Sequence, residues 1–499
     1  MKTIIKIFSF LLFLSPLFPQ QLYEEQIIPF DGLDSDHFGS AVAVSDSFLF
    51  ISSLRYSDHT QNSVYVYRLE NNSYSFLYKI YPSDTQSGTN GALFGVALLY
   101  SDGQLFVGAR NRKINNIPIG AVYLFEYEDY HWVEKQIILP PQPFSFGSWF
   151  SSFISKSNDY LLIGANRYDS EFESSGKAFL YKFINNQYEL YHEFSPFDAK
   201  EDQHFGSSGI IKDNTILIGS PLDSTKSGIY SGSVYVYFKE DSLWTFNQKY
   251  VPEPNSEYFK FGSAMAANDD YVFIGKSDDN PGKVYVYNYY PPLLDYDQFI
   301  ETGDNFSGDL FGVFMFPKGD SLLVGAFNDT VKNDLSGAAY LFVNKGERWE
   351  KKHKIYPSDE VNTRTFGYRG IITEDKIFIG ALGTKVNNIR SGAVYVYASM
   401  PLSVDENYTL NPKEFYLSQN YPNPFNPTTN ISYSISQRSF VTLKIYDVLG
   451  IEVTTLINKE VRAGSYEVEF DANNLPSGIY FYQIRAGAFV DTKKLVLLK

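Results

Sequence analysis

The chain has 499 residues, so it has room for two or three domains and a large core. It contains no cysteine, which excludes disulfides, thiolate nucleophiles and zinc sites with cysteine ligands. The formal net charge is −15, with the acid excess in the middle of the chain, and this excludes a surface that wraps nucleic acid or an anionic membrane. Aromatic residues make up 17% of the chain, and they favour pleated, half-buried surfaces, so we expect a mostly β protein.

Residues 1–20 are predicted to be a signal peptide. Lys2 and Lys6 precede an apolar run at residues 7–14, and Pro16 and Pro19 follow it. The run is too short to cross a bilayer. No later segment is long and apolar enough to form a membrane helix, so we expect no transmembrane span. The alternative is a cytosolic protein with an apolar N-terminus.

A Phe-Gly pair recurs along most of the chain at intervals of 50 to 59 residues. Its seven copies begin at Phe38, Phe94, Phe146, Phe205, Phe261, Phe311 and Phe366. A period of about fifty residues is typical of propeller blades and solenoid units. Each Phe is expected to fill the gap between neighbouring blades, and each Gly to permit close backbone approach.

Each repeat contains four predicted strands whose polarity increases along the repeat. The first is rich in small residues, as in residues 39–44, and the second is a continuous apolar run, as in residues 105–109. The third follows a Gly-x-Val-Tyr-Val-Tyr pattern, as in residues 232–237, and the fourth mixes aromatic and charged residues, as in residues 349–357. A run without polar alternation is covered on both faces, so we expect the sheets to pack against one another with the first strand at the axis and the fourth at the rim.

Short and long connections alternate within a repeat. Polar turns such as residues 45–47 join strands one and two, and turns such as residues 185–186 join strands three and four. Longer loops follow strands two and four. Because these long loops lie at the same end of the strands, we expect them to form one elaborate face of the domain.

The last repeat ends at residues 391–397 without a fourth strand. The missing strand is predicted at the other end of the repeat region, at residues 22–29. A repeat divided between the two ends is what a closed ring requires, so residues 21–400 are predicted to form a seven-bladed β-propeller whose N-terminal strand closes the last blade. The alternative, an open β-solenoid, would leave strand edges uncapped.

After a polar, proline-containing linker at residues 401–415, the pattern changes to short alternating strands separated by turn signals. Residues 441–447 and 466–470 are examples. Such strands over residues 416–499 predict a small Ig-like β-sandwich. The predicted fold class is therefore all-β in both parts.

The Phe-Gly pairs, the Gly-x-Val-Tyr-Val-Tyr strands and the pattern Trp-x-x-x-x-Lys-Ile-x-Pro-x-Asp resemble the FG-GAP repeats of the integrin α-subunit propeller, especially the short bacterial form. The resemblance covers residues 22–400. Calcium-binding members carry an Asp-x-Asp-x-Asp-Gly loop between strands one and two, whereas this chain has a hairpin there, as at residues 212–215. So short a turn cannot supply the roughly six or more oxygen ligands of Ca²⁺, and we expect no metal site and no cofactor.

Residues 416–499 resemble the type A C-terminal sorting domain of the type IX secretion system, in residues 421–427, 445–450, 475–481 and 493–499. The residues expected to carry the sorting signal are Pro422, Asn423, Pro424, Gly450, Gly478, Lys493 and Lys494. The resemblance implies a Gram-negative cell of the Bacteroidetes kind, Sec export to the periplasm and passage across the outer membrane by the type IX machinery. It also implies that the domain is commonly cleaved and that the passenger is released or anchored to surface lipopolysaccharide.

Acidic and aromatic residues of the long loops are the candidate ligand-binding groups. They are Asp34, Asp36, Tyr56, Tyr168, Asp202, Tyr230, Asp304, Asp309 and Asp359. Exposed tyrosines stack well on sugars and on protein ligands, and paired carboxylates can act on a sugar as general acid and base. The alternative is that these carboxylates are ordinary solvated loop charges. The third-strand tyrosines are expected to be packing residues.

No motif in the sequence predicts a catalytic residue. His37 and His204 stand at the same place in two repeats, which repeat architecture explains as well as a shared pocket does. No His-Glu-x-x-His motif, nucleophile elbow, sialidase box or phosphate-binding glycine loop occurs.

The sequence therefore predicts a secreted or surface-displayed, monomeric propeller that binds a protein or glycan as a non-enzymatic adhesion module. The first alternative is a carbohydrate-active enzyme that uses loop carboxylates in the central depression. The second is a purely structural surface component.

Overall fold

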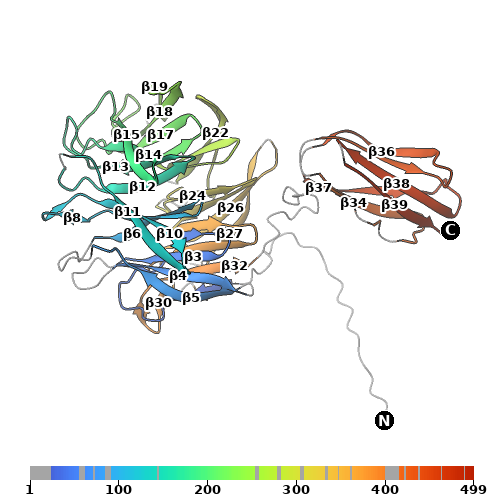
Figure 1. Ribbon diagram of the computed structural model, residues 1–499, viewed down its shortest axis with the longest axis horizontal. Helices are drawn as coiled ribbons and strands as arrows, with labels where there is room; N and C mark the ends of the chain where they lie inside the picture. Colours follow the sequence, from blue (N-terminus) through green and yellow to red (C-terminus); the bar gives the residue numbers. More distant parts are fainter. Residues whose placement is uncertain are drawn as a thin grey trace, which may run out of the picture. The chain divides into compact units, whose positions relative to one another are not determined.

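The computed structural model describes residues 24–54, 62–70, 73–84, 92–142, 145–252, 258–277, 282–303, 308–331, 335–346, 348–359, 362–398, 415–417, 419–420, 423–435, 439–461, 464–487 and 489–498. The chain divides into two compact units, Met1–Ser399 and Met400–Lys499 (Figure 1). The described residues form strands, turns and loops without a helix, which confirms the all-β prediction. The predicted signal peptide, Tyr56, Asp304, Pro422 and most of the predicted linker lie outside the described residues.

The described part of the first unit contains seven four-stranded antiparallel sheets, numbered here in chain order. Sheet 1 consists of β2 (Val42–Val44), β3 (Phe48–Ser53), β4 (Ser63–Glu70) and β5 (Ser73–Ile80), and sheet 2 of β6 (Phe94–Ser101), β7 (Gln104–Ala109), β10 (Ala121–Glu128) and β11 (His131–Ile138). Sheet 3 consists of β12 (Phe150–Ser157), β13 (Tyr160–Ala165), β14 (Lys177–Ile184) and β15 (Gln187–Phe194), and sheet 4 of β16 (Ser208–Lys212), β17 (Thr215–Ser220), β18 (Ser233–Glu240) and β19 (Leu243–Tyr250).

The remaining sheets follow the same order. Sheet 5 consists of β20 (Phe261–Ala267), β21 (Tyr271–Lys276), β22 (Lys283–Tyr290) and β23 (Leu293–Ile300), and sheet 6 of β24 (Met315–Lys318), β25 (Ser321–Ala326), β26 (Ala338–Asn344) and β27 (Trp349–Ile355). Sheet 7 consists of β28 (Phe366–Ile372), β29 (Lys376–Ala381), β32 (Ala393–Ala398) and β1 (Glu24–Ile27). Two small hairpins, β8 (Lys113–Ile114) with β9 (Ile117–Pro118) and β30 (Lys385–Val386) with β31 (Ile389–Arg390), extend the loops of sheets 2 and 7.

The sheets form a β-propeller (Figure 1). The first strand of each sheet lies beside the first strand of the next sheet. Because β28 of sheet 7 also lies beside β2 of sheet 1, the sheets close into a ring. The second strands, such as β7 and β17, are buried along their whole length because neighbouring sheets cover both of their faces. The fourth strands, such as β5 and β19, are largely exposed, as expected for a rim.

The N-terminal strand completes the last sheet, as predicted. β1 pairs antiparallel with β32, from Glu24 opposite Tyr397 to Ile27 opposite Val394. The Glu24 carboxylate accepts hydrogen bonds from the backbone N–H of Ser358 at 3.0 Å and from its hydroxyl at 2.7 Å. A glutamate on β11 accepts the same pair of bonds from a serine in the loop before sheet 2, at 3.0 and 2.6 Å. β1 therefore takes the place of a fourth strand, and Glu24 makes the same contact that the glutamate of β11 makes.

The third repeat position differs from the predicted Phe146-Gly147. Phe146 is 72% exposed, whereas Phe150 is fully buried and begins β12. Phe150 forms a backbone bridge with Gly120, as the phenylalanines of other repeats do with the corresponding glycines. Ser151 has a φ of 79°, close to the 84° of Gly206 in the next repeat. The repeat position is therefore Phe150-Ser151, and Phe146 belongs to the preceding loop.

A large side chain near the start of several fourth strands ties neighbouring sheets together. Trp132 on β11 packs edge-on against Phe48 and Phe50 of sheet 1, with ring centroids 5.6 and 5.1 Å apart. Trp349 on β27 makes the same kind of contact with two aromatic rings on β21, at 5.5 and 5.1 Å. Because such an aromatic pair contributes about 0.5–1.5 kcal/mol beyond its buried area, these contacts stabilise each junction.

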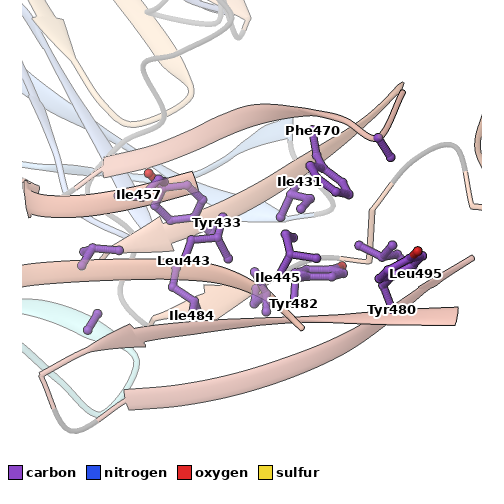
Figure 2. Close-up of a cluster of buried hydrophobic side chains, with 14 of the residues drawn as sticks. Ile431, Tyr433, Leu443, Ile445, Ile457, Phe470, Tyr480, Tyr482, Ile484 and Leu495 are labelled. Carbon is purple, nitrogen blue, oxygen red and sulfur yellow. The ribbon is translucent and has the colours of Figure 1, made fainter. Parts of the chain in front are cut away.

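The second unit contains two sheets around one core. One sheet has the order β33 (Tyr416–Leu417), β34 (Thr428–Ile435), β37 (Gly464–Asp471), and the other has the order β36 (Glu452–Val461), β35 (Ser439–Tyr446), β38 (Gly478–Ala486), β39 (Phe489–Leu497). Ile431 and Phe470 from the first sheet pack with Leu443 and Tyr482 from the second (Figure 2). The two-sheet architecture agrees with the predicted sandwich, and its Ig-like character stays a prediction.

Candidate ligand-binding site

Three long loops of sheets 2 and 3 surround a cavity. They are residues 110–120 after β7, the described residues 139–142 and 145–149 after β11, and residues 166–176 after β13. All three leave the strands at the end opposite to short turns such as residues 129–130 between β10 and β11. The cavity has a volume of about 860 Å³. It therefore lies on the face where the sequence pattern places the long loops.

Aromatic side chains form part of the cavity wall. Phe146 and Phe172 both line the cavity, and they are 72% and 48% exposed. Exposing large apolar side chains to water is unfavourable, and when they gather in a concave site they commonly serve a ligand.

Trp149 anchors arginine side chains at the same cavity. The guanidinium carbon of Arg167 lies 3.8 Å from the centre of the indole ring, and that of Arg110 lies 5.0 Å from it. Stacking fixes the plane of a guanidinium group and leaves the N–H donors at its edge available to a partner. Arg167 is exposed and lines the cavity, so its donors are accessible to a ligand there.

The loop of residues 166–176 adds carboxylates to the wall. Asp169 is held in place, because its Oδ1 accepts a hydrogen bond from the backbone N–H of Ser174 at 2.9 Å and its Oδ2 accepts one from the Ser145 hydroxyl at 3.1 Å. Glu171 and Glu173 are exposed and line the cavity. With Arg167 and Lys113 also present, the wall carries charges of both signs, which suits a polar ligand of some size rather than a single ion.

Two of the predicted ligand-binding carboxylates are buried. Asp36 accepts a hydrogen bond from the backbone N–H of Leu33 at 2.6 Å. Asp309 accepts hydrogen bonds from the backbone N–H groups of Phe311 at 3.0 Å and Gly282 at 3.4 Å. These contacts hold loop backbone in place, so the ligand-binding role predicted for Asp36 and Asp309 does not fit their surroundings.

The tyrosine predicted to stack on a ligand from residues 166–176 is also buried. Tyr168 is 7% exposed, and its ring packs edge-on against Phe179 at 5.5 Å. Burial raises the pKa of its hydroxyl. The prediction that Tyr168 is an exposed stacking residue is therefore wrong, and Phe172 of the same loop is the exposed aromatic residue instead.

The other described candidates are exposed but lie apart from the cavity lining. Asp34 accepts a hydrogen bond from the backbone N–H of Arg390 at 3.3 Å, and Asp359 accepts one from the side chain of Asn362 at 2.9 Å. Asp202 lies in the loop before β16, and Tyr230 lies in the loop before β18. A ligand-binding role for these four residues stays a prediction.

Several loop aspartates form a recurrent contact with the third and fourth strands. The hydroxyl of Tyr235 donates to Asp198 at 2.5 Å, and Lys249 lies 2.7 Å from the same carboxylate. Burial opposes ionisation, but the hydrogen bonds from Lys249 and Tyr235 hold the pKa of Asp198 below its usual value. The same arrangement recurs as Tyr65–Asp31–Lys79 and Tyr340–Asp329–Lys354. The repeat pattern predicts these tyrosines as packing residues but does not show that their hydroxyls pair with loop carboxylates.

The histidines do not form a shared metal site in the part of the chain that the structure describes, where no cluster of three or more His, Asp or Glu is placed to hold an ion. His37 Nδ1 lies 3.0 Å from the carbonyl oxygen of Leu54. Burial, assisted by Arg167, lowers the pKa of His204.

The sequence pattern does not identify the residues that form the cavity. It predicts a repeat position at Phe146 and gives no sign that Trp149, Arg167 and Phe172 meet there. The available signal was the segment Trp149-Phe150-Ser151, where a second phenylalanine competes with Phe146 for the repeat position.

Two family models match parts of the chain and confirm both resemblances. Residues 419–498 match the secretion system C-terminal sorting domain. Residues 23–67 and 192–237 match the FG-GAP repeat. The sorting domain indicates a secreted or cell-surface protein that interacts with the type IX secretion machinery. No helix among the described residues has the length and apolar character that a membrane span requires.

No curated protein matches the chain. Among solved structures, PorZ, a bacterial surface component of the type IX secretion system of Porphyromonas gingivalis, is 11% identical, with a TM-score of 0.34 over 92% of this chain and 70% of that one. A putative 6-phosphogluconolactonase from Bacteroides uniformis is 10% identical, with a TM-score of 0.41 over 64% and 85% of the two chains. The β-propeller domain of the Trilobed protease from Pyrococcus furiosus is 12% identical, with a TM-score of 0.39 over 71% and 93%. Similarities with such low sequence identities and TM-scores carry no information about function.

Proposed function

We propose that the propeller is a non-enzymatic binding module, secreted or displayed at the cell surface, that holds a protein or glycan ligand in the cavity between sheets 2 and 3. The observation that carries this proposal is that Phe146 and Phe172 stand exposed in the same cavity as the stacked Arg167. Aromatic rings pack on the apolar faces of sugars and side chains. A guanidinium group held in one plane donates directional hydrogen bonds to hydroxyl or carboxylate oxygens.

The size of the cavity also supports binding. Its volume of about 860 Å³ falls within the range of roughly 300–1,000 Å³ that is usual for ligand pockets. The sorting domain delivers the propeller to the outside of the cell, where a glycan or another protein is available to it.

The test is a screen of the purified full-length chain against glycans and extracellular proteins, followed by a comparison of variants. Phe146→Ala with Phe172→Ala is expected to weaken binding about tenfold or more, because interface energy is concentrated in a few aromatic and arginine side chains. Tyr130→Ala is the matched control, since Tyr130 is an exposed aromatic residue in the hairpin at the opposite end of sheet 2. Unchanged affinity in the double variant, or an equal loss in the control, would contradict the proposal.

A second candidate function is carbohydrate cleavage. Glu171 and Glu173 supply two exposed carboxylates from one loop at the same cavity, and glycosidases work with two carboxylates about 5–10 Å apart. Turnover of a bound glycan by the wild-type chain, lost in Glu171→Gln or Glu173→Gln with binding retained, would establish the enzyme and overturn the binding-only proposal.

A further inference from the structure

Exposed apolar side chains gather at one end of the second unit. Val448, Leu449 and Ile451, in the turn between β35 and β36, are 65%, 79% and 61% exposed. Ile479 at the start of β38 and Leu498 just after β39 are exposed as well. Large apolar side chains exposed next to one another are costly in water, and on a folded protein they commonly mark an interaction surface.

The strand register brings these residues to the same end of the four-stranded sheet. Tyr446, which ends β35 just before the turn, pairs with Phe481 on β38. On the next strand pair, Ile479 is opposite Val496 and Gly478 is opposite Leu497. Because side chains two residues apart share a face of a sheet, Ile479 and Phe481 point outward together with their partners Val496 and Tyr446.

The turn that carries the most exposed residues is held in one conformation. Asp447 Oδ1 accepts hydrogen bonds from the backbone N–H groups of Leu449 at 2.8 Å and Ile451 at 2.9 Å. The backbone N–H of Asp447 donates to the Ile451 carbonyl at 3.0 Å, and Gly450 takes a φ of 78° that other residues rarely adopt. A turn fixed in this way loses little conformational freedom when it binds, so its apolar side chains are preorganised for a partner.

Predicted sorting-signal residues from distant parts of the sequence meet at this end. Gly450 lies in the turn, and Gly478 begins β38. Asn423 Oδ1 accepts a hydrogen bond from the backbone N–H of Val496 at 2.9 Å, and its Nδ2 donates to the carbonyl of Lys494 at 3.2 Å. These residues therefore shape and fix the backbone that presents the apolar side chains.

We propose that this apolar end, formed by Val448, Leu449, Ile451, Ile479, Phe481 and Leu498, is the surface on which a protein of the secretion machinery receives the sorting domain. The match of residues 419–498 to a secretion sorting domain supplies the partner. Lys494 is exposed and pairs with Phe481, so a positive charge borders the apolar residues. Because protein interfaces combine an apolar centre with a polar rim of complementary charge, the receiving surface is an apolar groove with acidic residues along its edge.

The test uses the full-length chain in a bacterium with a type IX secretion system. Replacing Val448, Leu449 and Ile451 together by Ser is expected to lower the extracellular fraction about tenfold or more and to leave the protein in the periplasm, because a few side chains at the centre of an interface carry most of its affinity. The matched control is Phe440→Ser with Val490→Ser, two exposed apolar residues at the opposite end of the same sheet. This control is expected to be exported like the wild type.

A second variant distinguishes loss of binding from loss of folding. Leu449→Asp changes the most exposed residue of the turn and adds a negative charge facing the acidic edge, so it is expected to block export while the thermal unfolding of the purified chain stays unchanged. Wild-type export of both turn variants, or an equal loss in the control, would overturn the proposal. So would normal export combined with loss of self-association or of binding to lipid vesicles, since the apolar end would then serve a second copy or a membrane.

Discussion

Ser151→Gly is expected to stabilise the propeller, although it introduces glycine into a strand. Ser151 stands where Gly206 stands in the next repeat, with a φ of 79° in place of 84°. Its side chain is fully buried, and its hydroxyl oxygen has no hydrogen-bond partner among the described residues. The serine therefore combines an unfavourable backbone conformation with an unsatisfied polar group.

The magnitude follows from two contributions that favour glycine and one that opposes it. A left-handed conformation costs a residue other than glycine about 1–2 kcal/mol, and a buried hydroxyl without a partner costs about 1–3 kcal/mol. Glycine gives the unfolded chain more freedom, which offsets about 0.5–1 kcal/mol of the gain. The net increase in the free energy of unfolding is therefore expected to be roughly 1–4.5 kcal/mol.

Urea unfolding followed by tryptophan fluorescence measures this change in the full-length chain. All four tryptophans, Trp132, Trp149, Trp244 and Trp349, lie in the first unit, so the signal reports the propeller alone. The midpoint is expected to rise with an unchanged slope. Ser101→Gly is the control, because Ser101 has ordinary strand geometry at the end of β6 and glycine there is expected to destabilise by about 0.5–1 kcal/mol. A Ser151→Gly variant that is equally or less stable than the wild type would refute the reasoning.

Two further predictions concern closure of the ring and pH. Glu24→Ala removes both bonds to Ser358, so it is expected to lower the free energy of unfolding by about 1–2 kcal/mol and to speed hydrogen exchange in β1; unchanged exchange there would contradict this. Burial, followed by nearby carboxylates, raises the pKa values of Tyr123 and Tyr235 well above that of an unfolded tyrosine. Unfolding therefore releases protons once the tyrosines of the unfolded chain ionise at about pH 10. The urea midpoint is expected to be independent of these tyrosines below that pH and to fall above it. The tyrosinate absorbance of the folded chain is expected to appear at a higher pH than that of the unfolded chain. A urea midpoint that does not change up to about pH 11 would contradict the raised pKa values of these buried hydroxyls.

The repeat pattern was enough to predict the strands and the way the chain closes. Buried second strands such as β7 follow from continuous apolar runs, and exposed fourth strands such as β5 follow from mixed polarity. The pairing of β1 with β32 followed from counting strands in the first and last repeats. These features depend on local periodicity and on the need to satisfy backbone hydrogen bonds, which every short stretch of sequence records.

The cavity could not be predicted in the same way. Phe146-Gly147 looked like a repeat position, and only the backbone conformation at Ser151 shows that Phe150 holds that place and leaves Phe146 for the cavity. Likewise, nothing in the sequence distinguishes the buried Asp309 from an exposed loop carboxylate such as Asp359.

By itself, then, the sequence determined an all-β chain of repeats with a sorting domain, because strand periodicity, turn residues and terminal motifs are local properties. Tertiary structure decided which loop side chains meet at a cavity and which carboxylates are bound by tyrosine and lysine partners. It also decided which apolar residues remain exposed at one end of the second unit. The physical reason is that burial and contact depend on neighbours from distant parts of the chain, and folding alone brings those neighbours together.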